Sequence, residues 1–306
     1  MKVAKRNPRR SHFAAFLPLL LFLPLCTCGP APRKTIRLGP ELRENSGLII
    51  AGDQFIWHND SGDGPYLYRT DATGKLLRTD SLSAPASDYE DLTRDPAGNL
   101  YVGDFGNNRG TRTSHAIYRY DTAGRTAAIH FTYPDQAGAG ILEPGDYNCE
   151  AMVYYRDSLH LFTKNELGGR GNFYTYHYRL PARPGTHVAD LVDSLYLPRR
   201  VVTAGALDSV RGELVLTAYN FRMLLGIFPS GAASLITITD FPAGRFLRGR
   251  VHRRNLAWGW PTQFEAVDFY DEKWLYVAAE ATAVRRHGVA KRKRRRHRSQ
   301  SRDPRR

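Results

Sequence analysis

Cysteine is scarce in this chain, and the common catalytic and metal-binding sequence motifs are missing. Only three cysteines occur in 306 residues, and Cys26 and Cys28 stand near the N-terminus. Cys149 is then the one thiol of the body, which excludes an internal disulfide framework and a zinc site built on cysteine clusters. No Gly-x-Ser-x-Gly elbow, His-Glu-x-x-His motif or Walker loop is present. Without a histidine fixed beside it, Cys149 is expected to be a packed structural thiol.

Net charge is also small in the body, although the whole chain carries +14. The first 25 residues hold five Lys/Arg, and residues 285–306 hold twelve Lys/Arg against one Asp. The remaining body carries −2, so it offers no general basic face and a nucleic-acid partner is not expected there. The C-terminal block repels itself and is expected to be disordered. It is then either an arm for an anionic surface or a frame-shifted end without a selected role.

The N-terminus has the pattern of a secretion signal. A basic segment precedes 13 apolar residues, 13–25, a run too short for an ordinary membrane span and right for a signal-peptide core. The following Leu25-Cys26-Thr27-Cys28 resembles a bacterial lipoprotein signal, in which a lipidated cysteine becomes the mature N-terminus. Cys28 fits this pattern better than Cys26. An ordinary signal peptide with incidental cysteines is the alternative.

These features divide the chain into four parts and indicate its location. We predict a signal peptide over 1–28, a tether over 29–40, a folded body over 41–284 and a disordered basic tail over 285–306. The protein is expected to be exported and lipid-anchored, in the periplasm, at the outer membrane or on the cell surface.

The body is built on a repeated pair of short strands. In one unit, Leu92-Thr93 and Leu100-Tyr101-Val102 suit strands, and Asp95-Pro96-Ala97-Gly98-Asn99 suits the turn between them. Five such units occur, each 13 or 14 positions from its first residue to its last, with starts 44 to 60 residues apart. The units start at Ser46, Glu90, Glu150, Gly205 and Glu265. Strand repeats of this period are typical of β-propeller blades.

Further strand patterns follow the hairpins and complete four strands per unit. In the fourth unit, 223–228 and 234–239 take these places, whereas the fifth unit lacks outer strands of its own. Residues 35–38 could supply one by N-terminal closure of the last blade, and 281–290 is poor for the other. We predict a single all-β propeller of five four-stranded blades; a sixth, degenerate blade in 240–262 is the alternative.

Carboxylates recur where the inner strands start. The start of the first strand and the end of the second meet at one rim, so Glu90, Glu150 and Glu265 should gather around the channel axis. Converging carboxylates repel one another, and a hard cation with six to eight oxygen ligands resolves this. Two roles are open for these glutamates. The favoured one is that they cap backbone N–H groups of the adjacent blade. The alternative is a Ca²⁺ or Mg²⁺ site whose metal ligands are Glu90, Glu150, Glu265, Asn59, Asp104 and Asn165.

Several of these sequence pieces together resemble a known group of proteins. They are Ser46-Gly-Leu, His58-Asn-Asp-Ser-Gly, Tyr89-Glu-Asp-Leu, Asn99-Leu-Tyr-Val-Gly-Asp-Phe-Gly-Asn-Asn108, Glu150-Ala-Met and Thr163-Lys-Asn. Over about 45–280 the chain is similar to uncharacterised secreted bacterial β-propellers, related loosely to NHL-repeat, gluconolactonase-like and esterase-like phytase propellers. In gluconolactonase-like relatives, Glu and Asn side chains hold a central Ca²⁺. The resemblance implies that Glu90, Glu150 and Glu265 correspond to them, while Gly205 and Ala218 of the fourth unit depart from the pattern.

Two functions remain open from the sequence. The first is a non-catalytic, monomeric binding or scaffold module on the cell envelope, with a protein or glycan partner at one rim and the membrane reached through the N-terminal lipid. The second is a metal-dependent hydrolase of the lactonase or phosphoesterase kind, in which the cation polarises a carbonyl or phosphoryl oxygen. His58, His115 and His160 could serve as bases, but no nucleophile is fixed beside them. This absence favours the binding module.

Overall fold

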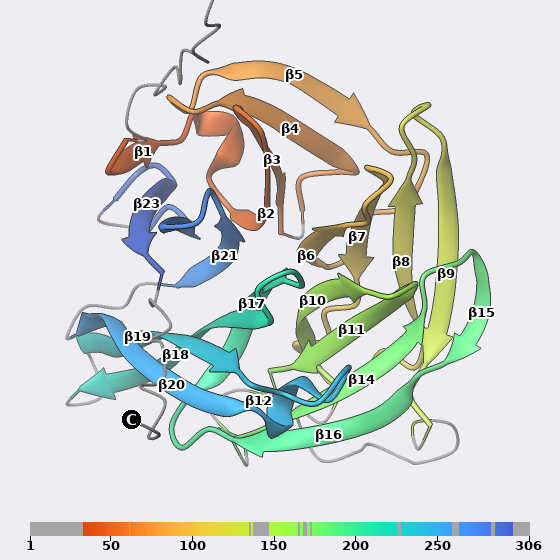
Figure 1. The fold of residues 1–306 in the computed structure, drawn as a ribbon. Helices are drawn as coiled ribbons and strands as arrows, with labels where there is room; N and C mark the ends of the chain where they lie inside the picture. The colour runs from red at the N-terminus through yellow and green to blue at the C-terminus, as the bar shows by residue number, and fades with distance from the viewer. Residues whose placement is uncertain are drawn as a thin grey trace, which may run out of the picture. The chain divides into compact units, whose positions relative to one another are not determined.

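Five antiparallel sheets stand around a common channel, each with its first strand innermost (Figure 1). This arrangement, seen in a computed structural model, confirms the predicted all-β propeller and its five four-stranded blades. The structure describes residues 33–60, 62–134, 136, 147–164, 166–167, 170–171, 173–224, 228–258, 263–282 and 285–295. The signal segment, Cys26 and Cys28 lie outside these residues. Within them, no helix has the length and apolar character needed to cross a membrane.

The first three blades follow the chain in order from the inside outward. Blade one contains β2 (Asn45–Ala51), β3 (Gln54–Asn59), β4 (Tyr66–Asp71) and β5 (Leu76–Ser81). Blade two contains β6 (Tyr89–Arg94), β7 (Leu100–Asp104), β8 (His115–Tyr120) and β9 (Thr126–Thr132). Blade three contains β10 (Cys149–Tyr155), β11 (Ser158–Thr163), β14 (Tyr174–Pro181) and β16 (Asp190–Tyr196).

Blades four and five complete the ring. Blade four contains β17 (Val201–Asp208), β18 (Glu213–Leu224), β19 (Phe228–Thr239) and β20 (Arg250–Trp258). Blade five contains β21 (Phe264–Phe269), β22 (Trp274–Ala279), β23 (Val289–Arg294) and, outermost, β1 (Thr35–Arg37). The remaining elements are a small hairpin of β12 (Glu166–Leu167) and β13 (Arg170–Gly171), the strand β15 (Gly185–Val188) that pairs with β9, and the 3₁₀ turns η1 (Pro40–Leu42) and η2 (Phe246–Arg248).

The turn between β6 and β7 shows why these residues form hairpins. The Asp95 carboxylate accepts hydrogen bonds from the backbone N–H of Asn99, at 2.9 Å, and from its side-chain amide, at 2.6 Å. Gly98 adopts φ +89°, which favours glycine. The Asp-x-x-Gly turns of the outer strands work similarly, because Asp71 and Asp121 each accept N–H groups two and four residues ahead.

Blade five closes the ring by joining the two ends of the body. β1 pairs with β23, as predicted for 35–38. β23, however, lies inside 285–306, so the folded body extends beyond 284 and the disordered tail does not begin at 285. Val289 and Ala290 are buried, and Arg295 is neutralised by Asp208 and Glu213, each at 2.8 Å. The prediction was wrong because it rested on the basic composition alone, whereas the acidic partners of Arg295 come from blade four. Residues 296–306 lie outside the described residues.

The candidate sixth blade is instead the edge of blade four. Residues 250–258 form β20, which pairs with β19 and is its outermost strand. The range 223–228, expected as a separate strand, instead contains the end of β18 and the start of β19, because both strands run for 12 residues. Because β18 and β19 are longer than the corresponding strands of the other blades, β19 begins later in its unit than the repeat pattern predicts.

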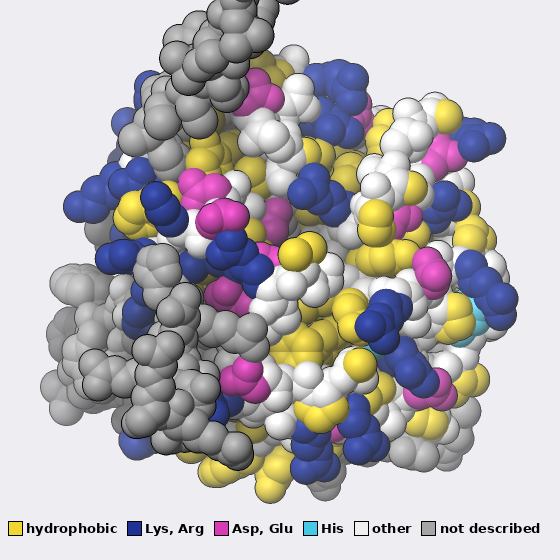
Figure 2. All heavy atoms as spheres, in the orientation of Figure 1, with side chains coloured by type: hydrophobic (Ala, Val, Ile, Leu, Met, Phe, Trp, Pro, Cys, Tyr) yellow, Lys and Arg dark blue, Asp and Glu magenta, His cyan; other side chains and the backbone are white. Residues whose placement is uncertain are grey.

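Hydrophobic side chains fill the spaces between neighbouring blades. Between blades five and one, for example, Phe55 meets Tyr276 edge-on with ring centroids 5.2 Å apart, and both are buried. These two aromatic residues are therefore part of the core. On the face drawn in Figure 2, basic and acidic side chains are interspersed.

A truncation before β23 tests whether this strand is needed to close the ring. A chain of residues 33–284 lacks the third strand of blade five, which also leaves β1 without its partner, so we expect it to lose its cooperative thermal unfolding transition. A chain of residues 33–296 retains both strands and is the matched control. Circular dichroism during heating distinguishes them. Equal melting temperatures for the two chains would contradict the role assigned to β23.

Candidate functional site

Every inner strand has one residue bulged out of its ladder near its start. The pairing with the second strand skips one position in each blade, and a bulge of this kind re-aims a side chain. The skipped residues are Ser46, Glu90, Glu150, Thr203 and Glu265, all buried. The fourth unit is therefore aligned at Thr203 and not at Gly205, which pairs with Leu216 within the ladder. The three predicted glutamates do occupy equivalent positions at one channel mouth.

The densest acidic group at this mouth joins blades one and two. One carboxylate oxygen each from Asp60, Asp88 and Glu90 lies within 4.8 Å of the other two, a spacing that suits ligands around a single ion. Glu90 is buried, and its Oε1 has no hydrogen-bond partner. A Cβ atom at Gly106 would collide with the carboxyl groups of Glu90 and Asp88, so glycine there keeps the space open.

A buried lysine stands beside these carboxylates. Lys164 Nζ donates to Glu150 Oε1 at 2.7 Å, and Lys164 is only 8% exposed. Its ammonium lies over the Tyr219 ring, 5.6 Å from the centroid, and attracts Glu90 and Glu265 electrostatically. The attraction of these carboxylates raises the pKa of Lys164 in spite of its burial. The lysine is therefore a fixed positive charge within the acidic mouth.

Blade five contributes a pair of carboxyl groups that share a hydrogen bond. Glu265 and Glu280 are hydrogen-bonded to each other, so one of them must hold a proton. Burial, then Glu280, raises the pKa of Glu265 well above its ordinary value. Gln263 also donates to Glu265 Oε1, at 3.2 Å. Burial also raises the pKa of Glu280 above its ordinary value.

The other acidic groups at the mouth are also hard to ionise. Burial raises the pKa of Glu90 well above its ordinary value, with the Glu150 charge adding to the effect. Burial likewise raises the pKa of Glu150 to about 7, although Lys164 opposes the shift. For Asp88, burial and the Asp60 charge raise the pKa to about 6. Burial therefore favours the protonated form of several carboxyl groups at this mouth, and Lys164 opposes the effect at Glu90, Glu150 and Asp88.

Two of the predicted metal ligands, Asn59 and Asp104, form hydrogen bonds with nearby residues, and a third, Asn165, cannot be placed. The Asn59 amide donates to the Glu41 carbonyl at 2.7 Å and to Asp63 at 2.9 Å, although its buried Oδ1 has no partner. Asp104 accepts the N–H groups of Ser87 and Asp88 and forms an ion pair with Arg112 at 3.0 Å. Asn165 lies outside the described residues.

Blade-to-blade capping is carried out by aspartates and not by the glutamates. Asp91 Oδ2 accepts the backbone N–H of Met152 at 2.7 Å and that of Gly205 at 3.1 Å, so it ties blades two, three and four together. Asp268 Oδ2 accepts the Ile50 N–H at 2.7 Å and joins blades five and one. Among the described hydrogen bonds, those of the glutamate carboxyls go to side chains.

Sequence reasoning missed Asp91, Asp268 and Lys164, although a signal existed for each. Asp91 and Asp268 are acidic residues inside otherwise apolar inner strands, where a charge needs a specific partner. Lys164 follows the second strand of its unit, the position predicted to lie at the mouth. The histidines considered as bases are buried, and burial lowers the pKa of His58 and His115 to about 4 and that of His160 to about 3.

Comparisons with known proteins support the fold. No protein-family model matches the sequence, and no curated protein matches it. Among solved structures, an exo-β-1,3-galactanase from Clostridium thermocellum aligns over 86% of this chain and 60% of its own, with a TM-score of 0.54 and 12% identity. A gluconolactonase from Xanthomonas campestris aligns over 85% of this chain and 89% of its own, with a TM-score of 0.43 and 12% identity. At such identities the likeness concerns the fold alone.

The Asp91 contacts lead to a stability prediction. Asp91→Asn replaces a carboxylate oxygen that accepts two backbone N–H groups, and we expect a loss of about 1.5–3 kcal/mol in the free energy of unfolding. Asp53→Asn, at an exposed turn, is the matched control and should stay within about 0.5 kcal/mol of wild type. Chemical denaturation measures both. A loss for Asp91→Asn no larger than that of the control would show that this tie contributes little.

The raised pKa of Glu90 leads to a pH prediction. The folded state holds the Glu90 proton more tightly than the unfolded chain, so stability from this group is complete below the unfolded pKa of about 4.3 and is lost as pH rises towards the folded pKa. Glu90→Gln lacks this loss. In metal-free buffer, the stability of the variant relative to wild type should therefore increase from pH 4.5 to pH 8, by about 1.4 kcal/mol per unit of pKa shift.

An exposed glutamate provides the control for this experiment. Glu272, whose side chain is 80% exposed, pairs with Arg211 on the surface, and Glu272→Gln should show no comparable increase. Comparing each variant with wild type at the same pH cancels the titration of the buried histidines. A pH-independent difference for Glu90→Gln would mean that Glu90 ionises normally in the folded protein.

Proposed function

We propose that this propeller is an exported binding module whose acidic channel mouth holds a divalent cation, Ca²⁺ by preference. The observation that carries the proposal is the group of Asp60, Asp88 and Glu90, whose carboxylate oxygens approach to within 4.8 Å while the buried Glu90 Oε1 lacks a partner. Such an oxygen is costly in a folded protein unless an ion or a proton satisfies it. A hard cation with oxygen ligands suits this donor set.

Lys164 and the Glu265–Glu280 pair complete the mouth around the cation. Lys164 pairs with Glu150, whereas the buried Glu90 Oε1 beside Asp60 and Asp88 has no hydrogen-bond partner, so a cation is best placed on this side of the mouth. A cation there would leave part of its coordination sphere open towards solvent. A protein or glycan partner with oxygen ligands could occupy these positions, which supports a binding role for this rim.

The cellular setting of the proposal depends on the N-terminus. The basic segment, the short apolar run and Cys28, or alternatively Cys26, support export and lipid anchoring, in the periplasm, at the outer membrane or on the cell surface. Expression of the full chain in bacteria, followed by mass spectrometry of the mature N-terminus, tests this part. A lipid on Cys28 is expected, and an unprocessed N-terminus would overturn it.

The metal proposal is tested by thermal unfolding of the chelator-treated protein titrated with Ca²⁺, Mg²⁺ and Zn²⁺. Wild type should be stabilised selectively by Ca²⁺, by about 2.7 kcal/mol when the ion is at 100 times its dissociation constant. Glu90→Gln should lose most of this stabilisation, because it replaces the unpartnered oxygen of the group. Glu272→Gln should respond as wild type does.

Two outcomes would overturn the metal proposal. One is an unchanged melting temperature with all three ions. In that case protonation and the charge of Lys164 would be what stabilises the buried carboxyl groups. The other is an equal Ca²⁺ response in wild type and Glu90→Gln, which would place the ion elsewhere.

A metal-dependent hydrolase of the lactonase or phosphoesterase kind is the second candidate function. The hydrogen-bonded Glu265–Glu280 pair favours it, because burial raises the pKa of Glu265, and a carboxyl group with a raised pKa can donate a proton to a leaving group. A bound cation would polarise a carbonyl or phosphoryl oxygen. Glu265→Gln should then abolish hydrolysis of a lactone or phosphoester while Ca²⁺ stabilisation persists. Ca²⁺ binding without hydrolysis of a lactone or a phosphoester would exclude the hydrolase and favour the binding module.

A further inference from the structure

The channel has a second site at its other end. Glu90 lies near the start of β6 and Arg94 at its end, so the two residues face opposite mouths. Around Arg94 is a pocket of about 270 Å³ lined by all five inner strands. Asp91 lies between the two ends, buried and bonded to the backbone of blades three and four. The pocket is therefore distinct from the acidic mouth.

The hydrogen-bond acceptors that line this pocket are largely occupied. Asp268 accepts the N–H groups of Ile50 and Phe269, one on each oxygen. Asp208 accepts the Arg211 N–H at 3.0 Å and an Arg295 N–H at 2.8 Å. Thr93 Oγ1 likewise accepts the Tyr154 N–H at 3.1 Å. A ligand that brought only donors would find few oxygens to receive them.

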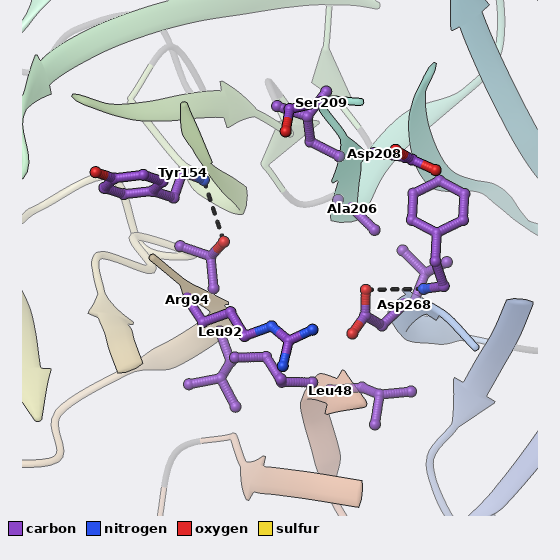
Figure 3. Close-up of a pocket in the computed structure, with 14 residues that line it drawn as sticks. Leu48, Leu92, Arg94, Tyr154, Ala206, Asp208, Ser209 and Asp268 are labelled. Atoms are coloured by element: carbon purple, nitrogen blue, oxygen red, sulfur yellow. Dashed lines mark hydrogen bonds between the residues drawn. The ribbon is translucent and has the colours of Figure 1, made fainter. Parts of the chain in front are cut away.

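The donors in the pocket, in contrast, make no hydrogen bond to the described residues. The Arg94 guanidinium points into the pocket towards Asp268, with which it interacts electrostatically (Figure 3). The Ser209 hydroxyl lines the same pocket. A guanidinium presents its donors in a fixed planar fork that matches a carboxylate or a phosphate. The pocket therefore offers donors and needs a ligand that supplies acceptors.

We propose that this pocket binds a small organic monoanion, a carboxylate, whose charged group is held by Arg94. The body of such a ligand would lie against Leu48, Leu92 and Phe269, which line the same pocket. A volume of about 270 Å³ is at the lower end of small-molecule sites and suits a compact ligand. Asp208 and Asp268 would repel a second negative charge, so the pocket selects against larger polyanions.

Benzoate, isobutyrate and phenylacetate are suitable probes, and benzamide is the neutral match for benzoate. Calorimetric titration of the full chain should give saturable binding of at least one of the anions and none of benzamide. Arg94→Gln should weaken that binding at least tenfold, whereas Arg125→Gln should leave it unchanged. Arg125 is an exposed arginine paired with Asp121 on a turn of blade two and is the matched control. Arg94 is exposed, so its replacement should not disturb the fold.

A second measurement on the unaltered protein follows Arg94 directly. Phenylglyoxal modifies accessible guanidinium groups, and peptide mass spectrometry reports each arginine separately. The bound anion should slow modification of Arg94 and not that of Arg125. Absence of saturable binding by all three anions would overturn the proposal, as would equal affinity in Arg94→Gln and wild type or equal protection of both arginines.

Discussion

The burial of negative charge along the channel is the constraint on which the rest of the structure depends. A propeller brings the starts of five inner strands to one mouth, and in this chain three of those strands place a glutamate at a bulge there. A fourth acidic residue, Asp91, is buried within the channel wall. Each buried charge needs a partner, because an unpaired one would cost several kcal/mol. The chain supplies different partners at different depths.

The partners divide the channel into a structural middle and two chemically different ends. In the middle, Asp91 and Asp268 accept backbone N–H groups from neighbouring blades, and these hydrogen bonds fasten the ring. At one end, Lys164 pairs with Glu150, while the buried Glu90 Oε1 has no hydrogen-bond partner. At the other end, Arg94 makes no hydrogen bond to the described residues and faces Asp268.

The repeat pattern predicted the fold well because a blade is a local structure. Asp95 and Gly98 fix a hairpin turn within a few residues, so regular spacing of such turns was enough to indicate five blades. The glutamates at the mouth were predictable for the same reason. Gly205 was aligned wrongly because the bulge at Thr203 has no sequence signal of its own. Arg295 was missed because its partners, Asp208 and Glu213, lie 87 and 82 positions away in the sequence. Lys164 was missed although Glu150 lies only 14 positions away, in the same hairpin.

The central claim is that the carboxylates around Glu90 hold a divalent cation. Its most direct test is a crystal grown with Ca²⁺ and measured at a wavelength where calcium scatters anomalously. The account predicts an anomalous peak between Asp60, Asp88 and Glu90, about 2.3–2.6 Å from one oxygen of each. Well-ordered density for all three carboxylates without an anomalous peak between them would contradict it.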